Sequence, residues 1–139
     1  MTEDGQPALE EMSVDECLEV LSRHAVGRLG VVIDGKPMIY PVNYVLDGDS
    51  VVFRNDPGAK LTNATLDPVA FEVDEIDESG RSGVSVVAQG VGVEFTEAVD
   101  EASLRARRLD LRPWTAGEKG HWVRITRAII TGRRLPPSA

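Results

Sequence analysis

The sequence predicts a mainly β protein, a closed or nearly closed antiparallel barrel of six or seven strands with three short helices at its ends. Three observations support this fold class. Runs rich in β-branched residues recur along the chain, and tight turns such as Asp34-Gly35 separate them. Helical spacing is confined to three short segments. Because the turns between strands are short, the strands are expected to be mostly antiparallel.

The first half of the chain predicts one helix followed by a three-stranded meander. Ser13-Val14-Asp15-Glu16 has the form of a capping box, and the helix is expected to continue to about His24. Tight turns at Asp34-Gly35 and Asp47-Gly48-Asp49 separate the strands that follow. These strands are predicted over Val26–Ile33, Pro37–Leu46 and Ser50–Arg54.

The second half predicts two more short helices and three further strands. A helix over Ala59–Leu66 is expected to stop at Asp67-Pro68, because the residue before a proline disfavours the helical region. Helical spacing returns in Asp100–Leu109. The strands are predicted over Val69–Val73, Val84–Phe95 and Trp122–Ile130, with an acidic loop at Asp74–Gly83.

Length and composition indicate a single folded domain. The chain has 139 residues, of which 42% are hydrophobic and 27% charged, as in an ordinary globular protein with one core. We expect residues 11–135 to form this domain, between a flexible N-terminal tail at 1–10 and a short C-terminal tail at 136–139.

Charge and residue usage exclude several classes of function. The net charge of −8 repels nucleic acid and anionic lipid. No apolar run approaches the length of about 20 residues that a membrane span needs, and the acidic start of the chain is unlike a signal peptide, so we expect a cytoplasmic protein. Cys17 has no cysteine partner, and His24 and His121 form no zinc-binding pattern. We therefore expect no metal, no nucleic acid and no membrane as partners.

Pro41-Val42-Asn43-Tyr44 interrupts the second strand of the meander. Proline has no amide hydrogen, so Pro41 breaks the ladder and can leave neighbouring backbone groups free for a ligand. An ordinary edge-strand proline is the alternative interpretation.

A strand end, a tight loop and a helix start bring two cations close together in the sequence. Arg54 and Lys60 flank Pro57-Gly58, and the predicted helix start offers free amide groups and a positive dipole end. The pair could close on a phosphate. Alternatively, both side chains only balance surface carboxylates.

The remaining candidates lie in the second half of the chain. Ser85 and Gln89 share one side of the long strand, where they either line a polar wall or face solvent. Trp114 lies in a glycine-containing loop and could cover a planar ligand or fill a subunit interface. His121 could exchange protons, with a structural role as the alternative. No nucleophile, base and orienting acid occur together, so no catalytic residue is assigned.

Taken in order, these motifs resemble the pyridoxamine 5′-phosphate oxidase-like family of FMN-binding split barrels, particularly its short actinobacterial and nitroimidazole-resistance-type members. The resemblance covers nearly the whole chain. Val84 stands where family members often carry tryptophan, and the C-terminal basic residues that bind substrate phosphate are missing, which argues against vitamin B6 oxidation. The matching segments are Val26-Gly27-Arg28-Leu29-Gly30, Pro41-Val42-Asn43-Tyr44, Phe53-Arg54, Gly58-Ala59-Lys60-Leu61, Ser85-Val86, Gln89-Gly90, Trp122-Val123-Arg124-Ile125 and Thr131-Gly132-Arg133.

The resemblance implies a flavin-dependent oxidoreductase that acts on an unidentified small molecule. It implies a homodimer that binds two FMN molecules in grooves between its subunits. The flavin carries the hydride chemistry, which accounts for the lack of a catalytic triad. A deazaflavin coenzyme or FAD is the alternative cofactor. A non-catalytic flavin-binding carrier or sensor, or a structural dimer with a vestigial groove, is the alternative function.

The resemblance also implies which residues hold the ring and the phosphate. Backbone groups of Pro41, Val42, Asn43 and Tyr44 would contact the isoalloxazine edge. The phosphate would be held by the segment that contains Phe53, Arg54, Lys60, Leu61 and Thr62, with Arg54 and Lys60 as its cations.

The second half of the chain would complete the same site. Ser85, Val86 and Gln89 would lie near the ring or the ribityl chain. Trp114 or His121 would reach the flavin from the partner subunit.

Overall fold

The computed structural model describes residues 5–55, 68–114 and 120–138. The strands are β1 Glu10–Glu11, β2 Val26–Ile33, β3 Lys36–Asp47, β4 Ser50–Asn55, β5 Pro68–Asp77, β6 Ser82–Glu94 and β7 His121–Leu135. The helices are α1 Val14–Ser22 and α3 Glu101–Ala106.

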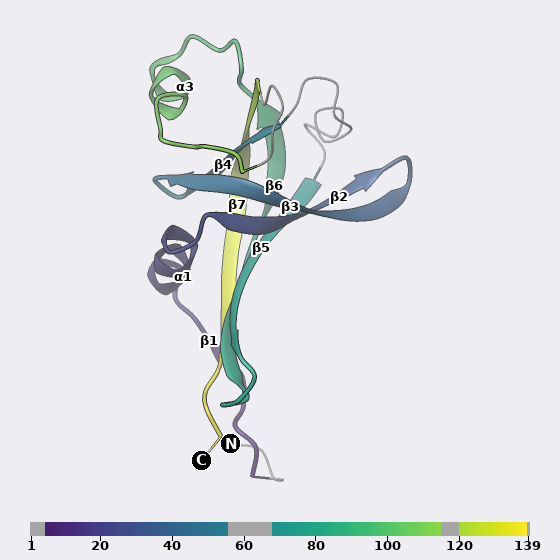
Figure 1. Cartoon of the computed structure of the whole chain (residues 1–139), viewed down its shortest axis with the longest axis vertical. Coiled ribbons are helices and arrows are strands. Elements are labelled where there is room, and N and C mark those ends of the chain that lie inside the picture. Colours follow the sequence, from purple (N-terminus) through teal and green to yellow (C-terminus); the bar gives the residue numbers. More distant parts are fainter. Residues whose placement is uncertain (1–4, 56–67, 115–119, 139) are drawn as a thin grey trace.

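The seven strands form one antiparallel sheet in the order β1-β7-β4-β3-β2-β5-β6. Because β6 also pairs with β7, strands β2 to β7 close into a barrel, and β1 is added at its edge beside β7 (Figure 1). This architecture confirms the predicted mainly β barrel. The helix predicted over Ala59–Leu66 lies outside the described residues.

The β5–β6 hairpin is longer than the sequence predicted. The sequence predicted an acidic loop at Asp74–Gly83. This prediction was wrong, because β5 and β6 continue to pair across most of the segment, as far as Asp77 and Ser82. The turn is therefore confined to the few residues between these strands, where Arg81 adopts a φ of 52°. Asp74 follows Glu72 on the outer face of β5, whereas Glu75 lies on the face of Val73, where it pairs with Arg23 and His24.

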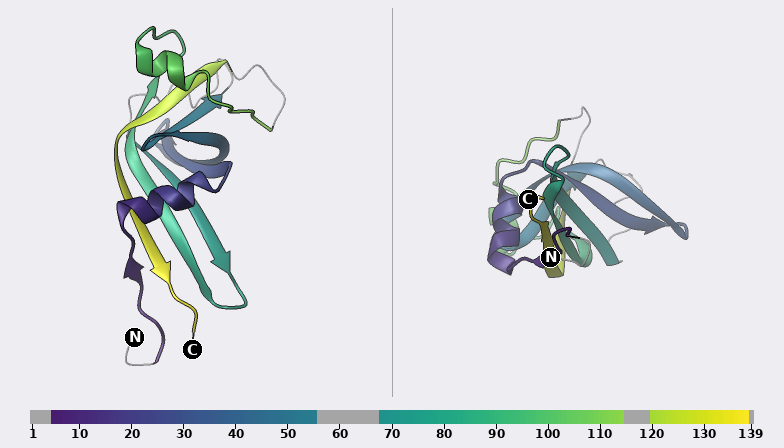
Figure 2. Two further views of the ribbon diagram at one scale, coloured as in Figure 1. Left: turned by 90° about the vertical axis from the view of Figure 1, so that its left-hand side faces the viewer. Right: turned by 90° about the horizontal axis from the view of Figure 1, so that it is seen from below.

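The last strand is also longer than predicted, and the helices are shorter. β7 continues past Ile130 to Leu135, because its second half pairs with both β6 and β1. This pairing brings the two ends of the described chain side by side (Figure 2). α1 ends at Ser22 with Arg23 as its C-cap, and α3 begins after its N-cap Asp100. No helix in the described ranges is both long and apolar enough to cross a membrane.

The predicted capping box begins α1. The Glu16 amide donates to Ser13 Oγ at 3.2 Å, and the Ser13 amide donates to Glu16 Oε1 at 3.2 Å. The Arg134 guanidinium on β7, together with Ser13, holds the pKa of Glu16 below its usual value. These contacts fix the helix across the barrel, with Cys17 and Leu21 buried against the core.

The main core fills the barrel interior. The Tyr44 and Phe71 rings meet edge to face at 4.7 Å, and the Tyr44 hydroxyl donates to the carbonyl of Leu21 on α1. Burial raises the pKa of Tyr44. Gly27 is required beside this pair, because a Cβ there would lie 2.1 Å from the Phe71 ring.

A second apolar cluster covers the outer side of β4 and the adjoining part of β7. The cluster packs under α3 and the segment that follows it. It contains the buried Trp122, whose ring centre lies 6.1 Å from that of Phe95. Its buried members are Val52, Phe95, Ala106, Leu111 and Trp122. We call this the covered side of the barrel.

Candidate functional site

Side chains alternate between the two faces of β3 around Pro41. Val42 and Tyr44 point into the barrel core, whereas Pro41 is exposed and Asn43 half-buried on the outer side. Val42 and Tyr44 can therefore offer a ligand only their backbone groups. Pro41 and Asn43 can offer side chains as well.

Among the described strands, none pairs with one edge of β3 beside this segment. Within the described residues, β4 pairs only with Tyr44–Asp47, so the edge of Lys36–Asn43 that faces β4 has no ladder. The opposite edge pairs with β2 along its whole length. Unpaired strand edges present backbone donors and acceptors in a row. The edge could therefore hydrogen-bond a ligand that lies along β3.

Asn43 holds the segment after α3 against β3. Its Oδ1 accepts a hydrogen bond of 2.8 Å from the Trp114 amide, and its Nδ2 lies 3.5 Å from the Ala25 carbonyl. The Trp114 side chain is 76% exposed. The structure thus brings two of the predicted site residues, Asn43 and Trp114, together on the outer side of the barrel.

Arg54 lies on the outer side of β4 next to this group. Its guanidinium donates to the Leu111 carbonyl at 3.1 Å and stacks 4.8 Å above the Trp122 ring. Its neighbour Phe53 is buried in the main core. The other predicted phosphate contacts, Lys60, Leu61 and Thr62, lie outside the described residues.

The predicted residues of β6 lie elsewhere on the barrel. Val86 is fully buried in the core, whereas Ser85 and Gln89 lie on the outer side. Following the closed sheet, β2 and β5 separate β3 from β6 on one path, and β4 and β7 separate them on the other. Ser85 and Gln89 are therefore separated from Asn43, although Gln89 lines one groove with Met38 and Ile39 at the hairpin end of β3.

His121 begins β7 and has a carboxylate partner that the sequence did not reveal. Its Nδ1 forms an ion-pair contact with Glu94 Oε1. The same carboxylate oxygen accepts from Thr96 Oγ1 at 3.0 Å, and Thr96 in turn accepts from the Trp122 amide at 2.9 Å. His121 pairs in register with Asn55, away from Asn43 and Trp114. This arrangement ties down the end of β7.

The outer side of β2, β5 and β6 is not covered by a helix of the described chain. A shallow groove of about 550 Å³ crosses it, lined by the β2–β3 hairpin together with residues of β5, β6 and β7. Ile39 and Ile129 expose 72% and 68% of their side chains there. We call this surface the open face; its groove residues include Gly30, Val32, Met38, Ile39, Gln89 and Ile129.

An ionic cluster adjoins the open face. Arg28 Nη1 lies 3.3 Å from a Glu72 carboxylate oxygen and 3.6 Å from one of Asp74. Burial, followed by the shared hydrogen bond and negative charge of Asp74, raises the pKa of Glu72 to about 7 despite Arg28. No local sequence pattern indicates this cluster, because it depends on the pairing of β2 with β5, whose residues are distant in the sequence.

Across residues 5–55, 68–114 and 120–138, no three metal-ligating side chains converge on one point. The predicted site residues that the structure describes form two separate groups on the outside of the barrel. The β3 group consists of the edge of β3 that pairs with no described strand, with Asn43, Arg54 and Trp114. The β6 group consists of Ser85 and Gln89.

Comparison with known proteins agrees with this architecture. The pyridoxamine 5′-phosphate oxidase family matches residues 13–134. An uncharacterised protein of Mycobacterium tuberculosis is 31% identical over 131 residues, which cover 90% of this chain and 84% of that protein.

Two solved structures share the fold and much of the sequence. A FAD-binding protein from Mycobacterium smegmatis is 37% identical with a TM-score of 0.74, over 90% of this chain and 98% of that one. A FAD-binding protein from Mesorhizobium loti is 26% identical with a TM-score of 0.71, over 91% of this chain and 97% of that one. These matches confirm the resemblance seen in the sequence motifs. The chain belongs to the pyridoxamine 5′-phosphate oxidase-like family of flavin-binding split barrels.

Proposed function

We propose that this protein is a flavin-dependent oxidoreductase that acts on a small molecule as a homodimer, with two flavins in the grooves between its subunits. The flavin, when bound, supplies hydride or electron transfer. The chain supplies binding, orientation and electrostatics. The observation that carries the proposal is the separation of the predicted site residues into two groups on different surfaces of one barrel.

Placement on two different surfaces supports a site between two copies. Asn43 adjoins Trp114 beside the segment after α3, whereas Gln89 lies in the groove of the open face, so one bound ring would not meet both side chains of the same chain. A second copy related by two-fold symmetry brings the β6 group of one chain to the β3 group of the other and forms two equal grooves. The open face offers the apolar surface that such a contact buries.

The residues of the β3 group fit a flavin. The edge beside Pro41, which pairs with no described strand, matches the polar edge of an isoalloxazine ring, and the adjacent apolar surface suits its flat faces. Arg54 provides a guanidinium just before the segment that contains Lys60, as a phosphate requires.

FMN and FAD share the ring and the first phosphate, so both fit these features. The resemblance in the sequence motifs points to FMN. Two solved relatives above 25% identity bear names that state FAD binding, which favours FAD. A deazaflavin coenzyme is the third candidate, and visible absorption distinguishes it from both flavins.

Titration of dialysed protein with FMN, FAD and the deazaflavin coenzyme tests the binding half of the proposal. We expect one of the flavins to bind, with its affinity reduced at least about tenfold in Arg54→Gln and in Lys60→Ala, or about 1.4 kcal/mol. Arg105→Gln, an exposed arginine on α3, is the matched control and should bind as the parent does. Failure to bind any flavin would contradict the proposal.

Reduction of the bound flavin tests the catalytic half. We expect NADPH or NADH to bleach the absorption of the bound flavin, and an added acceptor such as a quinone to restore it. A protein that binds flavin tightly, but shows neither reaction with any nicotinamide donor or acceptor tried, would be a carrier or sensor instead.

A further inference from the structure

A small pocket lies beside the β3 group. It occupies about 390 Å³ between the C-terminal end of α1, the outer side of β3 and residues 110–114. This volume is within the range of small-molecule sites, about 300–1,000 Å³. Its lining combines apolar walls with a few polar groups, among them Leu21, Ser22, His24, Asn43, Leu111 and Trp114.

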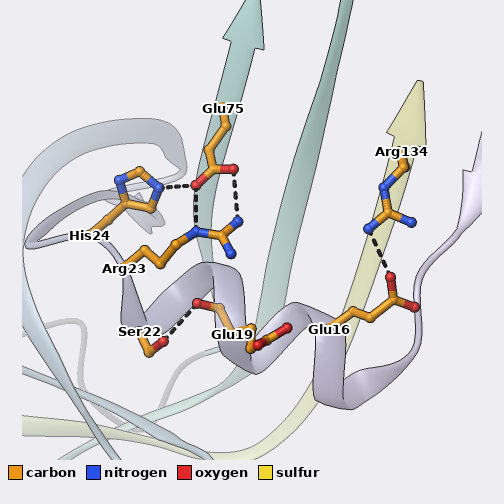
Figure 3. Close-up of polar contacts among 7 residues, drawn as sticks. All are labelled: Glu16, Glu19, Ser22, Arg23, His24, Glu75 and Arg134. Atoms are coloured by element: carbon orange, nitrogen blue, oxygen red, sulfur yellow. Dashed lines mark hydrogen bonds and ion pairs between the residues drawn. The ribbon is translucent and has the colours of Figure 1, made fainter. Parts of the chain in front are cut away.

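His24 is held in one orientation by a carboxylate on β5. Its Nε2 lies 2.5 Å from Glu75 Oε2 (Figure 3). Arg23 grips the same carboxylate, with its Nε 3.1 Å from Oε2 and its Nη2 2.9 Å from Oε1. The Arg23 guanidinium, with His24, holds the pKa of Glu75 below its usual value, so this carboxylate is ionised near neutral pH.

This arrangement sets the tautomer of the imidazole. An ionised carboxylate only accepts hydrogen bonds, so the proton of a neutral His24 lies on Nε2. Nδ1 then carries a lone pair and can accept a hydrogen bond. No described residue donates to Nδ1, although His24 lines the pocket.

The other polar groups of the pocket are mostly acceptors or already engaged. The Ser22 hydroxyl donates to the Glu19 carbonyl at 2.7 Å, which leaves only its oxygen lone pairs (Figure 3). Asn43 Oδ1 already accepts from the Trp114 amide. Trp114 adds an exposed indole ring to the wall. Arg112 and Asp110, which also line the pocket, pair with each other, with Nε 2.9 Å from Oδ1. On the His24 side the pocket thus offers acceptors next to a flat aromatic surface.

We propose that this pocket binds a planar aromatic compound with an O–H or N–H group, which donates to His24 Nδ1 while the ring lies against Trp114. Glu75 is then a positioning residue, because it acts on the ligand only through the imidazole. The pocket adjoins Asn43 of the β3 group, where the flavin is proposed to bind, so its occupant would be the substrate. The assignment as substrate rests on the proposed function, but the binding of the compound does not. Binding itself requires no flavin.

Two matched probes test the donor requirement. 4-Methylphenol and 4-methylanisole share the ring and the methyl group, but only the phenol can donate a hydrogen bond. Titrations followed by NMR should show millimolar binding of the phenol with shifts at the His24 imidazole and the Trp114 indole, and at least about fivefold weaker binding of the anisole. The measurement is made on flavin-free protein and again on protein saturated with flavin.

Variants separate recognition from folding. His24→Phe should bind the two probes equally, and Glu75→Gln should reduce the preference for the phenol. Val99→Ala, at an exposed site outside the pocket, should keep the full preference. Thermal unfolding by circular dichroism checks that each variant is folded, and the phenol-to-anisole ratio is a readout that a purely structural role for Glu75 would not change.

Several outcomes would overturn the inference: equal binding of the two probes to the parent protein, an unchanged preference in His24→Phe, or loss of phenol binding when flavin is added. The last result would make the pocket part of the flavin site itself. If the protein binds the phenol through His24 but no flavin, the inference stands and the proposed function fails.

Discussion

The two outer sides of the barrel follow the same strand pattern but are completed differently. On the covered side, β4 presents Val52 outward, and α3 with the segment after it buries this residue in the second cluster. On the open face, β2 and β7 present Val32 and Ile129 outward, and both side chains are more than half exposed. The chain itself buries the apolar residues of the covered side. On the open face, the apolar residues are not buried by any other described part of the chain.

The difference indicates where stability and function are located. A cluster buried by its own chain contributes to folding in proportion to the apolar area removed from water. An exposed apolar groove gains that energy only when a partner or ligand covers it. We therefore expect substitutions on the covered side to change unfolding, and substitutions on the open face to change association and flavin binding.

Phe95→Ala on the covered side should have the largest effect. The Phe95 ring is buried against Trp122, so its removal should lower the free energy of unfolding by about 3 kcal/mol through lost contacts and a residual cavity. Urea unfolding at low protein concentration measures this loss. An effect below about 1 kcal/mol would show that the cluster is loosely packed and that the two sides do not differ as described.

Ile129→Asp on the open face should instead weaken the proposed self-association. The side chain is 68% exposed in one chain, so a charge costs little until a second copy covers it. We expect at least about a tenfold rise in the dimer dissociation constant, with little change in the unfolding of the monomer. Sedimentation velocity measures the constant. Val99→Asp, exposed beyond the covered side, is the control, and an equal loss of dimer in both variants would disprove the assignment of the interface.

Glu72→Gln should produce the smallest effect, visible as a change in pH dependence. Folding raises the pKa of Glu72 from 4.5 to about 7. Between these two pH values, Glu72 is protonated in the folded state but ionised in the unfolded state. Stability from this group is present below that range and is lost as the pH rises through about 7. The variant lacks the loss and should gain roughly 1 kcal/mol relative to the parent between pH 5 and pH 8. Thermal unfolding at both pH values measures it; a gain at pH 5 instead would contradict the sign.

Local signals were sufficient to predict the elements of the first half of the barrel. The capping box at Ser13 and the turns at Asp34-Gly35 and Asp47-Gly48 involve neighbours in the sequence, and the structure confirms the elements beside them. The ends of β5, β6 and β7 depend on pairing with distant strands. That is why the predicted loop at Asp74–Gly83 became part of a hairpin.

The candidate site divides in the same way. Period-two alternation correctly placed Ser85 and Gln89 on one side of β6, because this geometry is local. The contact of His24 with Glu75 joins residues 51 apart, and that of Arg28 with Glu72 joins residues 44 apart. These residues come together because β2 pairs with β5 in the folded sheet. A histidine at the end of a predicted helix carried no sequence sign of its carboxylate partner.

Mixing two defective chains tests the central claim, a site shared between two copies. Arg54→Gln alters the β3 group, and Gln89→Glu alters the β6 group. At a flavin concentration that loads neither variant alone, a re-equilibrated one-to-one mixture should recover flavin binding in about a quarter of its sites, because each heterodimer has one intact groove. Recovery to that level, read from bound flavin absorption, is the predicted result. No recovery, although heterodimers form, would place the whole site within one chain and contradict the account.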